Sequence, residues 1–403
     1  MKILLVADVP LENPSSGSEK MVNRQAIGLS QDGIEVCAIV RLSEYVKSGI
    51  KKTGGIKIGR FYASPNRFLR FSYNHFKYPS RIYEHFCRQM PFSFVIAHQP
   101  FNCFVLLIKR KINDINILYN FHSPSHEEYL LSNGNRRTIG NCLPLFLRQK
   151  IERYCLQNAQ VVMAESQYMK QKVIDIHRIP DERIFVNPGG VDLDWFHPPE
   201  KRAFLKEELG LPADRLHLLT VRNLEPRMGL DNLLKSIALL KEKNNNIHLV
   251  IGGEGPERNN LESLIRNFGL KDDVTMTGFI PAEQLPKYYG AADFFVLPTR
   301  ELEGFGLVTP ESMACGTPVL GTPVGGTREI LSGFDSRLLF KDTSPEAMAE
   351  GILWAADYWL NDEEKYAKLR ERCRKYVEKH YSWERHVNQL IDILNQVGSK
   401  EMN

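Results

Sequence analysis

The sequence predicts an α/β protein built from two doubly wound parallel sheets. Apolar runs rich in Val, Ile and Leu alternate with helical patterns along the 403 residues. Continuous apolar strands between helices are typical of parallel sheets that helices cover on both faces. The runs are too numerous for one modest sheet, and they fall into two series on either side of a Gly- and Pro-containing stretch at 189–210.

Six strands are expected in each series. Those of the first lie at 2–8, 35–40, 93–98, 116–122, 160–166 and 183–189, and those of the second at 216–222, 247–253, 274–280, 293–299, 317–323 and 337–340. Helical segments separate most of them, and 381–399 reads as an amphipathic helix. We therefore expect an N-terminal Rossmann-like domain at 1–195, a C-terminal one at 196–380, and a helix in 381–403 that packs back on the first. Ligands of such folds bind beyond the carboxyl ends of the strands, so two facing domains place the site in the cleft between them.

Composition and charge narrow the class of protein. The chain has no run of about 18 apolar residues, and its N-terminus reads as a strand rather than a signal peptide. Seven scattered cysteines without a C-x-x-C pair favour a reducing cytosol over a disulfide framework or a zinc site. The net charge of +4 divides into +9 for 1–195, which holds 26 Lys+Arg against 17 Asp+Glu, and −5 for the remainder. The basic half indicates an anionic partner there.

The stretch 301–319, ELEGFGLVTPESMACGTPV, places two carboxylates around a glycine turn. Gly304 and Gly306 let a ligand approach the backbone, and Pro310 fits a first helical turn. A helix beginning near 306–310, after the strand 293–299, offers amides to an anion. Glu311 could then accept two hydroxyl hydrogen bonds, as a ribose diol requires, while Glu303 reaches a second polar group. A plain strand–helix turn with surface glutamates is the alternative.

Other candidate residues also follow strands. Arg222 ends the strand 216–222 and Arg227 lies in the next loop, where two guanidinium groups suit a diphosphate; two solvated arginines are the alternative. Gly253 lies in a turn that would pass under a nucleotide. Phe279 and Ile280 would flank its base, with core packing as the alternative.

Ordered blocks along most of the chain resemble the family 4 glycosyltransferases, which have the GT-B fold. They include SSGSEKMVNRQAIGLSQDGIEVCAIV at 15–40, YNFHSPSHEEY, NPGGVDLDWFHP, VRNLEPRMGLDNLLKSI, TGFIPAEQLPKYYGAADFFVLPT and the E-G-F-G-L-V-x-x-E run with SMACGTPV and GGTREI. Many blocks in one order are more specific than any one of them. The family commonly has a lysine where this chain has Met228, beside Arg227.

The resemblance implies a role for further residues. Gly17, in the loop after the first strand, would present its backbone to the diphosphate, with a flexible Gly/Ser loop as the alternative. His122 would lie near the donor sugar, with a hydrogen-bonded histidine at a strand end as the alternative. The donor site would also include Gly304, Phe305, Gly306, Leu307 and Val308. Glu303, His122, Arg222 and Arg227 would act in catalysis, with Glu303 on hydroxyls of the donor sugar and Glu311 on the ribose.

The resemblance further implies a retaining, metal-independent hexosyltransferase that uses a nucleotide sugar, with UDP the expected carrier. No cofactor or metal ion is expected. The Asp-x-Asp at 192–194 falls in a linker block, and His122 and His126 are i, i+4 but separated by a proline. The acceptor would be a hydroxyl of a glycan, a lipid or a small molecule. A sugar-nucleotide epimerase of the same architecture and a non-catalytic nucleotide-sugar-binding protein are the alternatives.

Cations and aromatic residues interleave over 51–90. Such a surface could contact anionic lipid or an acidic acceptor; alternatively the rings are core and the cations solvated. A nucleic-acid stripe would have a similar composition, but no nucleic-acid partner is expected. The expected location is cytoplasmic, with peripheral contact on the inner face of the membrane.

Overall fold

In a computed structural model of the chain, the described residues are 1–12, 14, 16–42, 48–63, 68–88, 91–132, 139–212, 214–242 and 246–399, with only the backbone described at 68–72 and 139. The chain forms two compact units. Unit 1 comprises Met1–Gly189 and Trp383–Asn403, and unit 2 comprises Gly190–Ser382. Among the described residues, no helix combines the length and the apolar character that crossing a bilayer requires.

Unit 1 is built on an eight-stranded sheet in the order β3-β4-β2-β1-β5-β6-β7-β8. The strands are β1 (Lys2–Ala7), β2 (Glu35–Leu42), β3 (Gly49–Thr53), β4 (Ile56–Tyr62), β5 (Phe94–Ala97), β6 (Asn116–Phe121), β7 (Val161–Ala164) and β8 (Ile184–Val186). All neighbours are parallel except β3 and β4. The six predicted strands of this series are present.

The β3–β4 hairpin was not predicted. Its two-residue turn is Gly54-Gly55, with φ of +56° and +85°, which is the conformation that a tight hairpin turn requires. Every β3 residue is exposed, whereas Ile56 and Ile58 of β4 are buried. The hairpin therefore adds an exposed edge to the sheet within the region read from the sequence as basic and aromatic.

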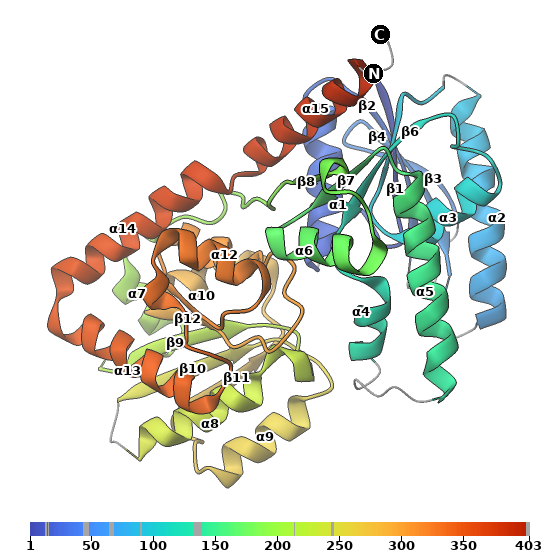
Figure 1. Cartoon of the computed structure of the whole chain (residues 1–403). Coiled ribbons are helices and arrows are strands. Elements are labelled where there is room, and N and C mark those ends of the chain that lie inside the picture. The colour runs from blue at the N-terminus through green and yellow to red at the C-terminus, as the bar shows by residue number, and fades with distance from the viewer. Residues whose placement is uncertain are drawn as a thin grey trace. The chain divides into compact units, whose positions relative to one another are not determined.

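The helices of unit 1 cover both faces of its sheet (Figure 1). They are α1 (Gly17–Gln31), α2 (Phe68–Cys87), α3 (Pro100–Ile108), α4 (Ser125–Ser132), α5 (Ile139–Asn158), α6 (Gln167–Lys172) and α15 (Trp383–Ser399), with a π-helical turn at Val173–His177 and a 3-10 turn at Asp181–Arg183. The last helix, α15, packs against α1, and Leu390, Ile393 and Leu394 join the core that Ile3 and Leu5 of β1 enter. The end of the chain thus completes the first unit.

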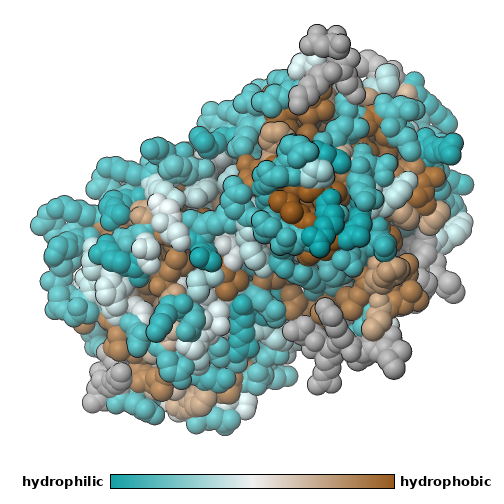
Figure 2. Space-filling model, viewed as in Figure 1, coloured by the Kyte–Doolittle hydropathy of each residue, from teal (hydrophilic) through white to brown (hydrophobic). Residues whose placement is uncertain are grey.

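On unit 1, α3 packs against α2 and also against α5. Hydrophobic side chains show at the surface over α5 (Figure 2). Leu143, Phe146 and Leu147 of that helix are exposed. These side chains do not contribute to the core of the unit.

Unit 2 has a five-stranded parallel sheet in the order β11-β10-β9-β12-β13. Its strands are β9 (Leu216–Val221), β10 (Ile247–Gly252), β11 (Val274–Gly278), β12 (Phe294–Leu297) and β13 (Val319–Gly321). Its helices are α7 (Arg202–Glu208), α8 (Leu230–Lys241), α9 (Arg258–Asn267), α10 (Leu285–Ala291), α11 (Val308–Ala314), α12 (Gly325–Phe334), α13 (Pro345–Asn361) and α14 (Glu363–His380), with 3-10 turns at Pro226–Met228, Ala282–Gln284 and Ser336–Leu338.

The prediction of a strand at 337–340 is wrong. The segment forms the 3-10 turn and a single bridge between Gly321 and Leu339. Asp335 caps the turn, because its carboxylate accepts a hydrogen bond from the amide of Arg337. Leu338 is nevertheless buried, so the apolar run packs in the core without strand pairing.

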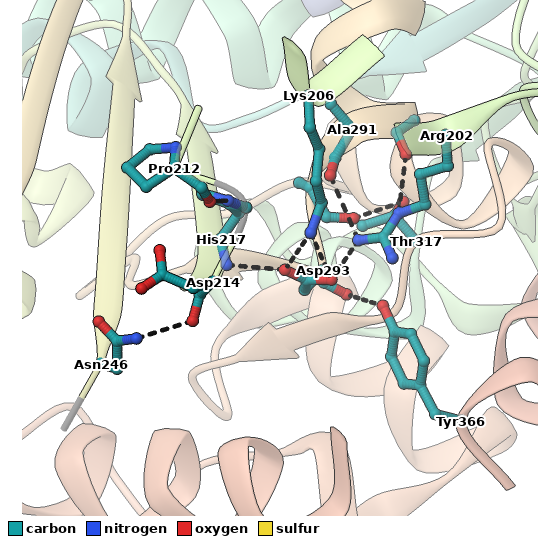
Figure 3. A network of polar contacts seen from close by, with 12 residues as sticks. Arg202, Lys206, Pro212, Asp214, His217, Asn246, Ala291, Asp293, Thr317 and Tyr366 are labelled. Carbon is teal, nitrogen blue, oxygen red and sulfur yellow. Dashed lines mark hydrogen bonds and ion pairs between the residues drawn. The ribbon is translucent and has the colours of Figure 1, made fainter. Parts of the chain in front are cut away.

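Buried Asp293 joins α7 and α14 to the amino end of the unit 2 sheet, through its carboxylate and its main-chain carbonyl respectively (Figure 3). Asp293 immediately precedes β12, and its carboxylate accepts hydrogen bonds from Arg202, from Lys206 at 3.1 Å and from the His217 amide at 2.7 Å. The Tyr366 hydroxyl of α14 donates to the Asp293 carbonyl at 2.7 Å. Burial opposes the charged form of Asp293, but Arg202 and Lys206 hold its pKa below the ordinary 3.8. This network lies at the sheet end opposite to the predicted donor site.

Candidate functional site

Arg222 and Glu303 form a nearly buried ion pair at the carboxyl end of the unit 2 sheet. Arg222 directly follows β9, and its amide donates to the Gly252 carbonyl at 3.0 Å, which extends the pairing of β9 with β10. The Arg222 Nη2 lies 2.5 Å from the Glu303 Oε2. Only 8% of the arginine side chain and 10% of the glutamate side chain are exposed. A solvated surface arginine, the alternative interpretation of Arg222, is therefore excluded.

Arg227 reaches the same loop from a second direction. It lies in the 3-10 turn after β9, and its Nη1 donates to the Leu302 carbonyl at 2.9 Å. In return, the Arg300 amide donates to the Arg227 carbonyl at 2.8 Å. The segment that follows β9 thus brings two guanidinium groups to the loop at 300–303, which lies far from it in the sequence.

Met228 also contributes to this arrangement. Its side chain is buried, and its sulfur lies 3.0 Å from the Arg222 Nη2. A thioether is a weak acceptor, so the sulfur occupies one side of the guanidinium without neutralising it. The family's common lysine at this position would instead add a second positive charge beside Arg222.

Hydrogen bonds and close packing fix the loop that carries Glu303. The Thr299 hydroxyl donates to the Glu303 Oε2 at 3.1 Å, and the Gly326 amide donates to the Glu303 carbonyl at 3.1 Å. Gly325 has φ of +57°, and a Cβ there would lie 1.9 Å from that carbonyl oxygen. Gly306 has φ of +80°. Both glycines are therefore required by the close packing and the backbone conformation of this turn.

Glu311 is almost fully buried, in the first turn of α11. Its exposed fraction is 3%, and its Oε2 accepts a hydrogen bond from the Tyr289 hydroxyl at 3.2 Å. Burial, and then the negative charge of Glu311, raise the pKa of Tyr289 well above its usual range, so the phenol remains the donor. Neither Glu303 nor Glu311 is a surface glutamate, which excludes the plain-turn interpretation for both.

The other predicted donor residues are placed as follows. Phe305 is buried in the core, whereas Gly304, Leu307 and Val308 are half-buried. Gly253 has φ of +128°, and a Cβ there would lie 1.8 Å from the Arg222 carbonyl oxygen.

The two residues predicted to flank the base differ in exposure. Phe279 is 67% exposed, whereas Ile280 is buried and its side chain covers Gly252. Core packing, the alternative interpretation, thus describes Ile280 and not Phe279.

The remaining two predicted residues belong to unit 1. Gly17 is the first residue of α1, not a loop residue as the sequence suggested, because Ser16 and Glu19 form a capping box that begins the helix there. The spacing S-G-S-E was the missed signal.

His122 follows β6 and pairs through its Nδ1 with the Glu165 carboxylate. Its Nε2 lies 3.1 Å from the Nδ1 of His98. Burial and the neighbouring His122 lower the pKa of His98 well below its usual range, so the His98 ring is neutral. Both ring nitrogens of His122 are therefore engaged within unit 1, and its role toward a donor stays a prediction. Neither Glu165 nor His98 was predicted from the sequence as a site residue, although each directly follows a strand, β7 and β5 respectively.

In the described part of the chain, no group of three or more His, Cys, Asp or Glu is arranged to hold a metal ion. In the Asp-x-Asp segment, the Asp192 carboxylate accepts a hydrogen bond from the Trp195 amide at 3.1 Å. That contact gives the carboxylate a local turn-forming role.

Two family models match the chain in succession. Residues 15–195 match "Glycosyltransferase Family 4", and residues 201–380 match "Glycosyl transferases group 1". The first match covers most of unit 1, and the second covers the unit that holds Arg222, Arg227 and both glutamates.

Curated proteins with similar sequences are named as glycosyltransferases. A GDP-mannose-dependent α-(1-6)-phosphatidylinositol monomannoside mannosyltransferase from Mycolicibacterium smegmatis is 29% identical over 59% of this chain and 63% of its own length. A D-inositol 3-phosphate glycosyltransferase from Xylanimonas cellulosilytica is 29% identical over 60% and 58%. The chain thus spans about six tenths of the length of the curated relatives it matches.

Solved structures match almost the whole chain. A sucrose-phosphate synthase from Thermosynechococcus elongatus has a TM-score of 0.81 at 22% identity, over 99% of this chain and all of its own. Anabaena HepE in complex with UDP has a TM-score of 0.74 at 17% identity, over 98% of this chain and all of its own. At these identities the likeness shows the fold, and the two parallel-sheet units are those of GT-B proteins.

Proposed function

The chain belongs to the family 4 glycosyltransferases, and from this we propose that it is a retaining hexosyltransferase that uses a nucleotide-diphosphate sugar. The observation that carries the proposal is the convergence of Arg222 and Arg227 on one loop. Arg222 contacts Glu303 and Arg227 contacts Leu302, the adjacent residue. Two fixed cations at the carboxyl end of a parallel sheet suit the diphosphate that departs from the anomeric carbon.

In this proposal each carboxylate binds one end of the donor. Glu303 accepts hydroxyl hydrogen bonds from the donor sugar, and Glu311 accepts those of the ribose. Negative charge grows on the diphosphate as the glycosidic bond breaks, and Arg222 and Arg227 stabilise it. The acceptor, a hydroxyl of a glycan, a lipid or a small molecule, attacks on the face that the diphosphate leaves, and the leaving phosphate accepts its proton. The configuration is then retained, and no metal ion is needed.

The carrier nucleotide is proposed to be UDP. The structures of HepE with UDP and with UDP-glucose support this choice, whereas the mycobacterial relative is named for GDP-mannose. A thermal-shift screen of UDP-, GDP- and ADP-sugars separates the possibilities, because a ligand that binds the folded state raises the unfolding temperature. A larger shift with a GDP-sugar than with any UDP-sugar would contradict the proposed carrier.

The activity is tested with the nucleotide sugar that gives the largest thermal shift and with a panel of acceptors. We expect a glycoside with retained anomeric configuration, formed at the same rate with and without EDTA. Epimerisation of the donor without an acceptor would instead indicate the epimerase. Tight nucleotide binding without turnover would indicate a binding protein.

We also propose a cytoplasmic location with peripheral contact between unit 1 and a membrane surface. All seven cysteines are free thiols, which suits a reducing compartment. Fractionation of cells under low and high salt tests both parts of this proposal, because an electrostatic contact is released by salt.

A further inference from the structure

The outward face of α2 carries cations and aromatic rings together. Tyr73, Phe76, Lys77, Ser80 and Arg81 are spaced three or four residues apart, so they share one side of the helix. They line an open hollow of about 700 Å³ together with Glu84, Lys109 and Lys111. Lys109 and Lys111 follow α3, which packs against α2.

The hollow is strongly cationic. Four Lys or Arg side chains line it against one carboxylate, Glu84, which pairs with Lys111 at 2.8 Å. Lys77 Nζ lies 4.9 Å from the centre of the Tyr73 ring, and Lys109 Nζ lies 5.6 Å from that of Phe76. The rings hold these ammonium groups at the surface without neutralising them.

Exposed hydrophobic side chains also occur on the two neighbouring helices. Tyr73 and Phe76 are 58% and 48% exposed. Ile108 of α3 and Leu143, Phe146 and Leu147 of α5 are also exposed, and α3 packs against both α2 and α5. We call these side chains and the hollow the α2–α3–α5 face. Figure 2 shows its hydrophobic part over α5.

The hairpin does not belong to this face, although its cations fall in the basic region of the sequence. Lys51 and Arg60 pair with Glu12, and Lys57 pairs with Glu35. These cations already have carboxylate partners. The described part of the basic and aromatic region that lines the hollow is therefore on α2, and residues 64–67 and 89–90 of that region lie outside the described residues.

We propose that the α2–α3–α5 face lies on the headgroup layer of an anionic bilayer. Lys77, Arg81 and Lys109 contact lipid phosphates, while the exposed rings and the aliphatic tip of α5 enter the interface. This deepens the proposed membrane contact of unit 1, and it does not depend on the donor or on the reaction.

Other occupants fit less of the surface. A soluble acidic peptide or a nucleic acid would match the cations but leave Leu143 and Leu147 exposed to water. A second copy of the chain would cover the hydrophobic side chains but bring two like-charged hollows together. A bilayer interface offers phosphates and apolar chains side by side, which is the pattern of this face.

The test is co-sedimentation of the whole protein with vesicles of phosphatidylcholine alone and of phosphatidylcholine with 30% phosphatidylglycerol. We expect binding to the anionic vesicles, at least tenfold weaker binding to the neutral ones, and release by salt. Lys77→Glu/Arg81→Glu should weaken anionic binding at least tenfold, since each basic residue near such a surface contributes about fivefold. Lys271→Glu/Lys341→Glu is the matched control, because it makes the same charge change at exposed sites on unit 2.

A second pair of variants tests the hydrophobic part. Phe146→Ala should weaken anionic binding, whereas Phe204→Ala, at a ring of 62% exposure on unit 2, should not. Equal loss in variant and control, no vesicle binding, or binding abolished by millimolar inorganic phosphate would overturn the proposal. So would a dimer that Phe146→Ala dissociates. A thermal shift with the donor nucleotide on each variant keeps failure of this surface distinct from failure of the donor site.

Discussion

Replacing Arg222 by alanine would remove the only ion-pair partner that the described residues supply to Glu303. The carboxylate would remain nearly buried, with the Thr299 hydroxyl as its remaining side-chain donor. Breaking a buried pair in this way costs about 3–5 kcal/mol, and the partial exposure of 8% and 10% places the expected loss near the lower limit, about 3 kcal/mol. Donor binding or turnover should also fall at least tenfold, which corresponds to about 1.4 kcal/mol.

Urea unfolding of the whole chain measures the first effect, and donor titration measures the second. Glu303→Gln combined with Arg222→Ala should recover part of the lost stability, because the uncompensated charge is then absent. Lys368→Ala is the control, since its side chain and that of its partner Glu364 are 64% and 79% exposed, and such a pair should contribute less than about 1 kcal/mol. The reasoning is refuted if Arg222→Ala unfolds at the same urea concentration as the parent and binds donor equally well.

Four further changes have defined outcomes. Glu311→Ala should reduce donor turnover about tenfold or more in initial-rate assays. Asp293→Asn should cost about 3 kcal/mol in urea unfolding at pH 7; because the folded pKa of Asp293 lies below 3.8, the difference from the parent should narrow as the pH falls below that value. Burial lowers the pKa of His386 to about 4, so the unfolded chain binds more protons and thermal stability should fall between pH 6.5 and 4, less so in His386→Gln. Gly325→Ala should lower both stability and donor affinity, because its Cβ would meet the Glu303 carbonyl.

The strands were largely readable because a buried parallel strand needs an apolar run. All predicted strands are present except the one at 337–340. The hydrophobic residues of that segment correctly indicated burial, but the cap at Asp335 favours a 3-10 turn instead of a strand. The β3–β4 hairpin was missed for the opposite reason. The residues of β3 are exposed and mostly polar, so this strand gives no apolar run in the sequence. The Gly54-Gly55 turn was the only local signal of the hairpin.

The candidate site was predicted as residue types rather than as contacts. Arg222 and Glu303 are 81 positions apart, and nothing local in the sequence couples them. The sequence also could not separate Phe279 from Ile280, because both follow β11 and only the three-dimensional packing places one side chain over Gly252. His122 was chosen through its resemblance to a family motif, whereas its partners Glu165 and His98 come from the ends of neighbouring strands.

The Arg222–Glu303 pair bears on how the donor would bind. The Arg222 Nη2 is engaged by the Glu303 carboxylate at 2.5 Å, whereas the Arg222 Nε is buried and has no hydrogen-bond partner among the described residues. A diphosphate could bond this Nε, with the Nη2 still on Glu303, only if the groups that cover the Nε move aside. Glu303 would then fix the orientation of Arg222 and bind the sugar with its other oxygen. On this argument Arg222→Lys, which keeps the charge but lacks the second direction of hydrogen bonding, should bind donor nearly as weakly as Arg222→Ala. Donor affinity equal to that of the parent would show that charge alone suffices.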